Sequence, residues 1–308
     1  MTMSVTEKKA YLATIIAIVL FGFSFMFLKI ALTENGGRIF DVLSYRFILS
    51  SIIILLLKFC KIIRLDFKGK SLRMLFMMCL LQPVLYFILE VIGVSKVASS
   101  EAGMMLSVMP VFTIVMGSIF LKERITRRQV FFILVSISGI ILINVMSYQP
   151  GNSSNLGRFV LLLSIATGSM YSILSRKLSL EFTPIERTFA MQLIGGGAFF
   201  MISLSTNLWN RTVASYFSNL ANPRLLFPIL YLGIGCSLVA FFLLNYAVTH
   251  LEVSKTSILT NLAPIVSILA GVLILNERFL WYHFVGSVII LLGVIGATWF
   301  SPRAKPFQ

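Results

Sequence analysis

The chain has 308 residues, of which 58% are hydrophobic and 12% are charged, with a net charge of +15. Soluble domains carry about 25% charged residues, so this composition excludes an ordinary soluble protein. The basic residues lie in short segments between apolar runs and not on one face of a domain, which argues against nucleic-acid binding. Apolar runs of roughly 18–23 residues match the ~30 Å of hydrocarbon that a helix must cross. Unbroken runs favour helices over barrel strands, so the sequence predicts an all-α integral membrane protein in a lipid bilayer.

Ten such runs predict ten transmembrane helices. The first five cover about 11–32, 42–59, 72–94, 99–121 and 129–145, and the second five cover about 157–174, 188–205, 225–248, 254–275 and 282–300. The turn-rich stretch 146–155 separates them, so we expect one five-helix unit over 1–150 and another over 151–308. Very short links between the third and fourth runs, and between the eighth and ninth, predict tight antiparallel hairpins.

The distribution of Lys and Arg predicts the orientation. With the N-terminus inside, 18 of the 26 basic residues fall in cytoplasmic segments and 6 fall in outer segments. Cytoplasmic loops of membrane proteins carry this excess, so we expect both termini in the cytoplasm of a plasma (inner) membrane protein. The first run is longer than the apolar core of a signal peptide, and we expect it to be retained as a helix.

An internal repeat appears at an offset of 154 residues without gaps. It pairs Pro110 with Pro264, Glu123 with Glu277 and Gly139 with Gly293, and also Gly117 with Gly271 and Ser100 with Ser254. Five spans per half is an odd number, so the second half enters the membrane upside down. Inverted repeats are typical of secondary transporters, which bind substrate near the midplane between the halves.

The repeated motifs resemble those of the EamA family of the drug/metabolite transporter superfamily. The resemblance covers about 10–300 and rests on the segments 20–32 (LFGFSFMFLKIAL), 45–47 (YRF), 110–124 (Pro to LKER), 167–171 (TGSMY) and 264–278 (Pro to LNER). Lys122 and Asn276 stand where the family usually has Gly, at expected loop edges. The resemblance implies a ten-helix inverted-repeat transporter of small metabolites or amino acids, often an exporter, with a central cavity between its halves.

Polar residues inside a bilayer are costly and therefore mark candidate substrate contacts. Lys29 either reaches the interface, anchors a substrate carboxylate or phosphate, or pairs with Glu90. Arg46 either reaches the interface, forms a structural salt bridge, or contacts substrate. Glu90 shares a predicted helix face with Tyr86 and Gln82, beside Pro83, which loosens the helix. This face either lines a cavity or packs on another helix.

The second group of candidates lies around two equivalent prolines. Ser107 precedes Pro110 by three residues, and Asn261 precedes Pro264 by three. Each polar side chain either satisfies backbone that the proline frees or faces a cavity. Thr260, Tyr171, Gln192 and Asn245 are further candidates, for a cavity or for packing between helices. Pro83, Pro110 and Pro264 are the expected kinks.

The motifs favour transport over other functions. The sequence has no P-loop, which argues against direct ATP drive, and we expect no cofactor, no metal site and no catalytic residues. Asp41 and Asp66 are predicted in loops, so an embedded enzyme has few acids to use. A flippase for a lipid-linked substrate is the nearest competing function, followed by a membrane receptor or scaffold. Proton coupling through Glu90 and uncoupled diffusion fit equally, and the cations Lys29 and Arg46 suit an anionic or zwitterionic metabolite. We expect a monomer.

Overall fold

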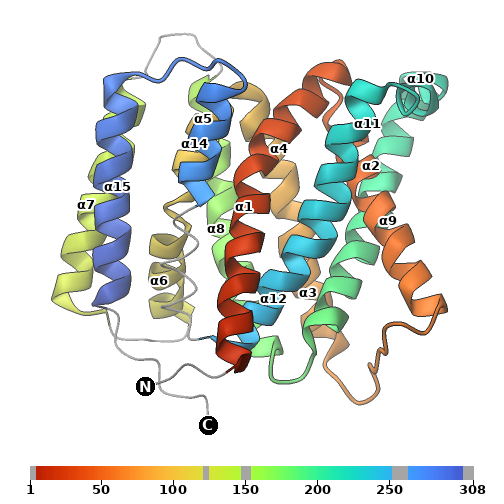
Figure 1. Cartoon of the computed structure of the whole chain (residues 1–308), viewed down its shortest axis with the longest axis horizontal. Coiled ribbons are helices and arrows are strands. Elements are labelled where there is room, and N and C mark those ends of the chain that lie inside the picture. The colour runs from red at the N-terminus through yellow and green to blue at the C-terminus, as the bar shows by residue number, and fades with distance from the viewer. Residues whose placement is uncertain (1–4, 121–124, 147–153, 252–262, 301–308) are drawn as a thin grey trace.

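The computed structural model describes residues 5–120, 125–146, 154–251 and 263–300, and all regular structure in these ranges is helical (Figure 1). The first half contains α1 (Val5–Glu34), α2 (Ile39–Phe59), α3 (Leu72–Cys79), the π-helix η1 (Leu80–Leu85), α4 (Tyr86–Lys96), α5 (Ser99–Leu106), α6 (Met109–Phe120) and α7 (Arg127–Met146). The second contains α8 (Ser154–Leu178), α9 (Pro184–Trp209), α10 (Val213–Asn219), α11 (Pro223–Leu230), η2 (Tyr231–Ala240), α12 (Phe241–His250), α14 (Ala263–Leu273) and α15 (Trp281–Trp299).

Seven helical segments of the described chain are long and apolar enough to cross a membrane. They are Lys8–Glu34, Ile39–Phe59, Leu72–Lys96, Ser99–Gly117, Ser154–Leu178, Pro184–Trp209 and Pro223–Ala247. A shorter apolar helix runs over Trp281–Ala297. The protein is therefore a multi-pass helical membrane protein. Crossings by α7, α14 and α15, at the predicted fifth, ninth and tenth spans, stay predictions.

Two of the long segments change helix type midway. Leu72–Lys96 passes through η1, where Gln82 leaves the helical region (φ −145°, ψ 118°) beside Pro83. Pro223–Ala247 passes through η2. These segments are the predicted third and eighth spans, so the irregularity occurs once in each half. π-turns inside α-helices are often found at functional sites.

The helices pack in pairs that join the two halves of the chain. α2 packs along α9, α7 along α15 and α5 along α14, and Figure 1 places α7 and α15 at one side of the bundle. The contact of α4 with α8 has a counterpart in α1 with α12, and that of α6 with α8 has one in α1 with α14. These contacts of one half thus have partner contacts in the other.

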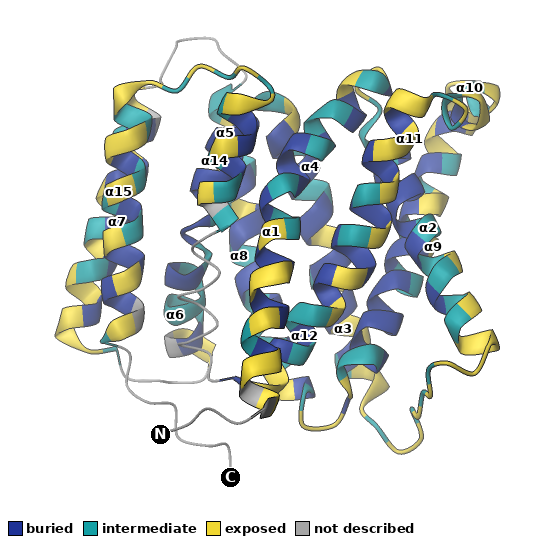
Figure 2. Cartoon of the chain, in the orientation of Figure 1, coloured by how far each residue is buried: buried dark blue, intermediate teal, exposed yellow. Residues whose placement is uncertain are grey.

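Figure 2 shows buried positions on the inner sides of the helices and exposed positions on their outer sides. Many of the exposed residues are large and hydrophobic. Glycines allow close approach where helices meet. A Cβ at Gly195 would meet Pro83 and Phe47, and one at Gly196 would meet Ser51. Both glycines therefore serve the packing of α9 against the first half, whereas Gly197 has open space around it.

The bundle has two ends, which we name by the turns found there. The α4–α5 end carries the link of two residues between Lys96 and Ser99, which confirms the predicted tight hairpin. The α8–α9 end carries the turn between Leu178 and Pro184, and the start of α1 and the end of α15 lie at this same end in Figure 1. The predicted link between the eighth and ninth spans lies outside the described residues.

Candidate functional site

A buried polar cluster joins α2, α9 and η2; we call it the central cluster, and it consists of Arg46, Ser50, Gln192 and Ser237. Arg46 is 2% exposed, and its Nε donates to Ser237 Oγ at 2.6 Å. Gln192 is fully buried, accepts from Ser50 Oγ at 2.7 Å, and donates to the Ser237 carbonyl. The cluster therefore links the two halves of the chain through residues 46–50, 192 and 237.

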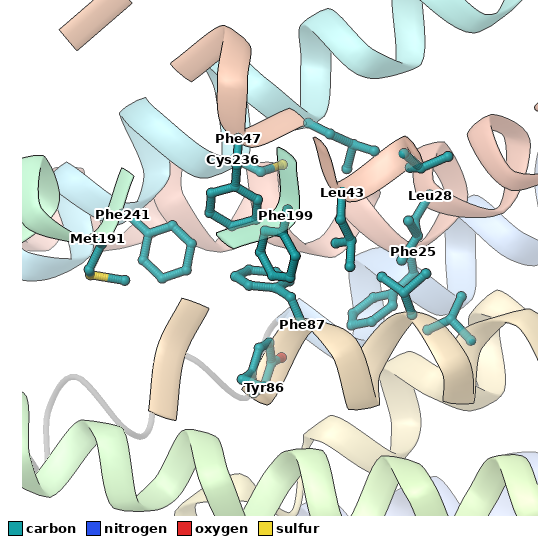
Figure 3. Close-up of a cluster of buried hydrophobic side chains, with 14 of the residues drawn as sticks. Phe25, Leu28, Leu43, Phe47, Tyr86, Phe87, Met191, Phe199, Cys236 and Phe241 are labelled. Carbon is teal, nitrogen blue, oxygen red and sulfur yellow. The ribbon is translucent and has the colours of Figure 1, made fainter. Parts of the chain in front are cut away.

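Aromatic rings surround the Arg46 guanidinium. Its carbon lies 4.3 Å from the centre of the Phe87 ring and 5.5 Å from that of Phe47. These rings belong to a buried aromatic group, in which Phe47 also contacts Phe199 at 5.0 Å between centroids (Figure 3). Arginine over an aromatic face is stabilised without an anion, which leaves its charge available to another partner.

Glu90 lies near the central cluster but is not bridged to it. Tyr86 Oη donates to Glu90 Oε1 at 2.8 Å, and Glu90 is 5% exposed. The charges of Arg46 and Glu90 act on each other, yet within the described residues no ion pair closer than 4.0 Å joins them. The helical face predicted from Gln82 to Glu90 holds between Tyr86 and Glu90 only, because the backbone at Gln82 is not helical.

A second buried cluster surrounds Arg187 on α9; we call it the Arg187 cluster. Arg187 is fully buried and its Nη1 donates to Ser175 Oγ at 2.8 Å, while Nη2 donates to Thr249 Oγ1 at 3.0 Å and to the Asn245 carbonyl at 3.1 Å. Asn245 Nδ2 donates to Thr188 Oγ1 at 3.0 Å, and Tyr171 Oη lies 3.4 Å from Asn245 Oδ1. Tyr171 and Asn245 therefore meet here and not at Arg46.

Lys29 binds the end of a helix. Its Nζ donates to the carbonyls of Val94 at 3.2 Å and Val97 at 2.7 Å, where α4 ends. A cation at a helix C-terminus satisfies free carbonyls and stabilises the helix dipole. The predicted alternative of an ion pair with Glu90 is wrong for this structure, because the ammonium is held by α4 carbonyls.

Acidic residues complete the α4–α5 end. Glu277 accepts from the backbone N–H groups of Ser99 at 2.7 Å and Ser100 at 2.9 Å, so it caps the start of α5. Burial would raise the pKa of Glu277, but the hydrogen bonds from Ser100 and Ser99 outweigh it and hold this pKa below its ordinary value. Glu101 forms a buried ion pair with Arg158.

Two of the predicted kinks, Pro110 and Pro264, lie at or near the start of a helix. α5 ends at Leu106 and α6 begins at Met109, so the helix breaks just before Pro110. Ser107 Oγ donates to the Met104 carbonyl at 2.5 Å, which agrees with the interpretation that it satisfies local backbone. Pro264 is the second residue of α14. Thr260 and Asn261 lie outside the described residues.

Sequence reasoning misses two buried charges. It assigns Arg187 to a cytoplasmic loop, but α9 begins at Pro184, where Thr183 and Glu186 form a capping box. That motif, Thr-Pro-x-Glu, is the available signal. The prediction of Asp41 in a loop is wrong: it lies in the first turn of α2, is 2% exposed, and accepts from Ser203 Oγ and Asn207 Nδ2, both at 2.6 Å.

A separate apolar cavity of about 600 Å³ lies between α6, α7 and α8, lined by residues such as Val111, Phe112 and Ile140. None of the predicted substrate contacts lines it. Over the described ranges, no group of His, Cys, Asp and Glu side chains could hold a metal ion. The polar chemistry of the described chain is thus concentrated in the central cluster, the Arg187 cluster and the α4–α5 end.

Comparison with known proteins points to one family. The model of the EamA-like transporter family matches residues 8–145 and, a second time, 155–299. The uncharacterized transporter YcxC of Bacillus subtilis strain 168 is 35% identical over 292 residues, covering 94% of this chain and 93% of its own. A probable terminal-alkyne amino-acid exporter of Streptantibioticus cattleyicolor is 24% identical over 203 residues, covering 66% and 65%. A crystal structure with 16% identity shares the fold, with a TM-score of 0.64 over 97% of this chain and 99% of the other.

Proposed function

The chain belongs to the EamA-like transporter family, and we propose that it is a secondary transporter that exports a small polar metabolite bearing a carboxylate, such as an amino acid. Transport proceeds by alternating access between two inverted repeats, over 1–150 and 151–308. The protein acts as a monomer in the plasma membrane. That the protein is a membrane transporter follows from its family, whereas its substrate, direction and mechanism are proposed.

The observation that carries the proposal is the position of Arg46. It is a buried cation between helices of both halves, its one hydrogen bond within the described residues goes to a neutral hydroxyl, and aromatic rings cover its face. Taking a charge out of water without an anionic partner costs several kcal/mol, so such a residue needs a compensating role. A substrate carboxylate supplies that partner, since guanidinium groups bind carboxylates through two parallel hydrogen bonds.

The architecture supports alternating access. The helix contacts occur in pairs between the two halves, and the central cluster draws residues from both. We propose ten membrane crossings, with α7, α14 and α15 completing them, and both termini in the cytoplasm, as the 18 to 6 distribution of basic residues indicates. On this orientation the α4–α5 end is outside and the α8–α9 end is inside.

Glu90 suits the other charge of a zwitterion. It lies within electrostatic reach of Arg46 while its carboxylate is hydrogen-bonded to Tyr86, so it can attract a substrate ammonium or carry a proton. The name of the Streptantibioticus relative, an amino-acid exporter, favours an amino-acid substrate. A lipid-linked substrate is less favoured, because the cavity between α6, α7 and α8 is lined by apolar side chains.

The test is counterflow of labelled L-amino acids, one at a time, in proteoliposomes. We expect flux in the wild type, a loss of at least tenfold in R46Q, partial recovery in R46K, and wild-type flux in R73Q, which removes an exposed arginine of α3. Wild-type flux in R46Q would overturn the role of Arg46.

In the same vesicles, E90Q separates coupling from binding: flux that becomes independent of pH indicates proton coupling, and an unchanged pH profile rules it out.

A further inference from the structure

Arg187 differs from the other buried cations of the described chain in its partners. Arg158 faces Glu101, and Arg46 lies within reach of the Glu90 charge. Within the part of the chain that the structure describes, Arg187 contacts only hydroxyl and carbonyl oxygens, and its fully buried Nε has no hydrogen-bond partner. Over the described ranges, no carboxylate lies within 4.0 Å of it.

The Arg187 cluster and the central cluster lie along one interface. On α9, Arg187 and Gln192 are five residues apart, about 7.5 Å along the helix axis. On the facing segment, Asn245 of the Arg187 cluster and Ser237 of the central cluster are eight residues apart, about 12 Å. The polar groups thus follow the contact of α9 with η2 and α12, from Arg46 in the bundle towards the α8–α9 end.

Neutral partners stabilise a guanidinium through hydrogen bonds but leave its charge uncompensated. Removing a charge from water is unfavourable by several kcal/mol, and hydrogen bonds to hydroxyl and carbonyl oxygens offset only part of that cost. An arginine whose described neighbours include no acid and no acceptor for its Nε is suited to an anion that is present for part of the time. Carboxylates fit best, because their planar oxygens match the arginine fork.

We propose that Arg187 is a second carboxylate-binding station, which holds the substrate at the α8–α9 end before it reaches or after it leaves Arg46. The proposal rests on the transport function proposed above. On the orientation given there, the station faces the cytoplasm, and it binds substrate when α9 and α12 separate at that end. The substrate then exchanges its carboxylate between two arginines whose partners Asn245 and Ser237 are about 12 Å apart along the helix axis.

The experiment measures KM from each side of the membrane. Right-side-out and inside-out proteoliposomes, sorted by orientation, are assayed with the labelled L-amino acid that gives the highest wild-type flux. We expect R187Q to raise KM at least tenfold at the α8–α9 side and less than twofold at the other. R187K should stay within threefold of the wild type. K177Q, which removes an exposed lysine at the same end, should change neither value.

A second measurement separates binding from support of the fold. The melting temperature of purified wild-type protein should rise with the L-amino acid and rise less with its amide, which lacks the carboxylate. In R187Q this difference should shrink, and in R187K it should persist. If R187Q does not fold, R187K is measured in its place. A purely structural role predicts that R187K has a lower melting temperature and equal KM values on the two sides of the membrane. That result would overturn the proposal.

The outcomes distinguish this proposal from the proposed function. Wild-type vesicles without flux of any amino acid would overturn the amino-acid transport function on which the station rests. Wild-type flux with equal KM changes on both sides in R187Q would overturn the station alone and leave the role of Arg46 standing. A side-specific rise in KM with R187K near the wild type supports both.

Discussion

The two ends of the bundle both contain buried charged residues, but these residues have different partners. At the α4–α5 end, acids and bases meet: Glu277 caps α5, Lys29 binds the end of α4, and Glu101 pairs with Arg158. At the α8–α9 end, the buried cation Arg187 meets only hydroxyl and carbonyl oxygens among the described residues. The first arrangement fixes the turn between α4 and α5 from both sides, whereas the second leaves a positive charge unneutralised.

Because the two halves are related by an internal repeat, equivalent positions at the two ends can be compared. Gly22 of α1 packs against Val266 of α14, and Gly168 of α8 packs against Met109 of α6, so the two glycines occupy matching places. These glycines align the first helices of the two halves at an offset of 146, eight residues less than the offset of 154 between the Pro110 and Pro264 motifs, and Lys29 then falls opposite Ser175. One half therefore carries its cation on the first helix, and the other receives it from Arg187, which binds that same serine.

Inverted halves need not open with equal ease. In the proposed alternating-access mechanism, paired charges at the α4–α5 end have to separate before substrate can pass, which opposes opening there. At the α8–α9 end, a substrate anion would improve the electrostatics instead of competing with an existing carboxylate. The comparison predicts that mutations at the α4–α5 end act mainly on stability and opening, and that R187Q acts mainly on binding.

The largest stability effect is expected when the buried ion pair at the α4–α5 end is broken. E101Q leaves Arg158 buried opposite a neutral amide, and removing one partner of a buried pair costs about 3–5 kcal/mol. SDS-driven unfolding in mixed micelles measures this loss, with E181Q, which alters an exposed acid, expected within about 0.5 kcal/mol of the wild type. Equal stability of E101Q and E181Q would show that the pair does not hold this end.

A smaller effect, about 1 kcal/mol, is expected for E277Q. The variant keeps the hydrogen-bonding shape but loses the charge that stabilises the N-terminus of α5. The pKa of Glu277 is lowered in the folded protein, so its contribution is present above the ordinary value of 4.5 and is lost as pH falls through the lowered value.

The measurement for Glu277 is the melting temperature as a function of pH. The difference between wild type and E277Q should be constant at neutral pH, begin to decrease near pH 4.5 and disappear below the lowered pKa of Glu277. E34Q, at the same end, is the control, because among the described residues Glu34 accepts a single side-chain hydrogen bond, from Asn222 Nδ2 at 3.4 Å. A difference that persists unchanged at low pH would contradict the role of the charge.

The helical membrane fold is predictable from the sequence, because apolar runs and charge placement are properties of the chain itself. The repeat also singles out Gly117 and Gly271 without giving a cause. The structure supplies one for Gly271, where a Cβ would collide with the Glu277 carboxylate and Ser99. Sequence reasoning assigns Glu277 only to a helix end, since a cap formed with residues 178 positions away leaves no local pattern.

Candidate residues are predicted less completely, for a physical reason. Spacing along one helix joins Tyr86 with Glu90 correctly, but it says nothing of contacts between helices. Arg46 bonds to Ser237, which lies 191 residues later in the sequence. Tyr171 meets Asn245 in a different cluster, 74 residues away in the sequence. Both contacts depend on how distant helices pack. Arg187 is missed because its helix begins before the apolar run does.

The smallest effect is expected at the rim of the α8–α9 end, where Lys70 pairs with Glu186 at 2.7 Å. The Lys70 side chain is 21% exposed, and Glu186 keeps hydrogen bonds from the Thr183 and Asp66 N–H groups when Lys70 is changed. Partly exposed pairs contribute about 0.2–1 kcal/mol, so K70Q should lose no more than that, and K68Q, which removes an exposed lysine, should lose less. SDS unfolding of both variants beside E101Q tests the comparison directly. If K70Q lost as much stability as E101Q, the α8–α9 end would also be stabilised by paired charges. The electrostatic difference between the two ends would then no longer favour opening at one of them.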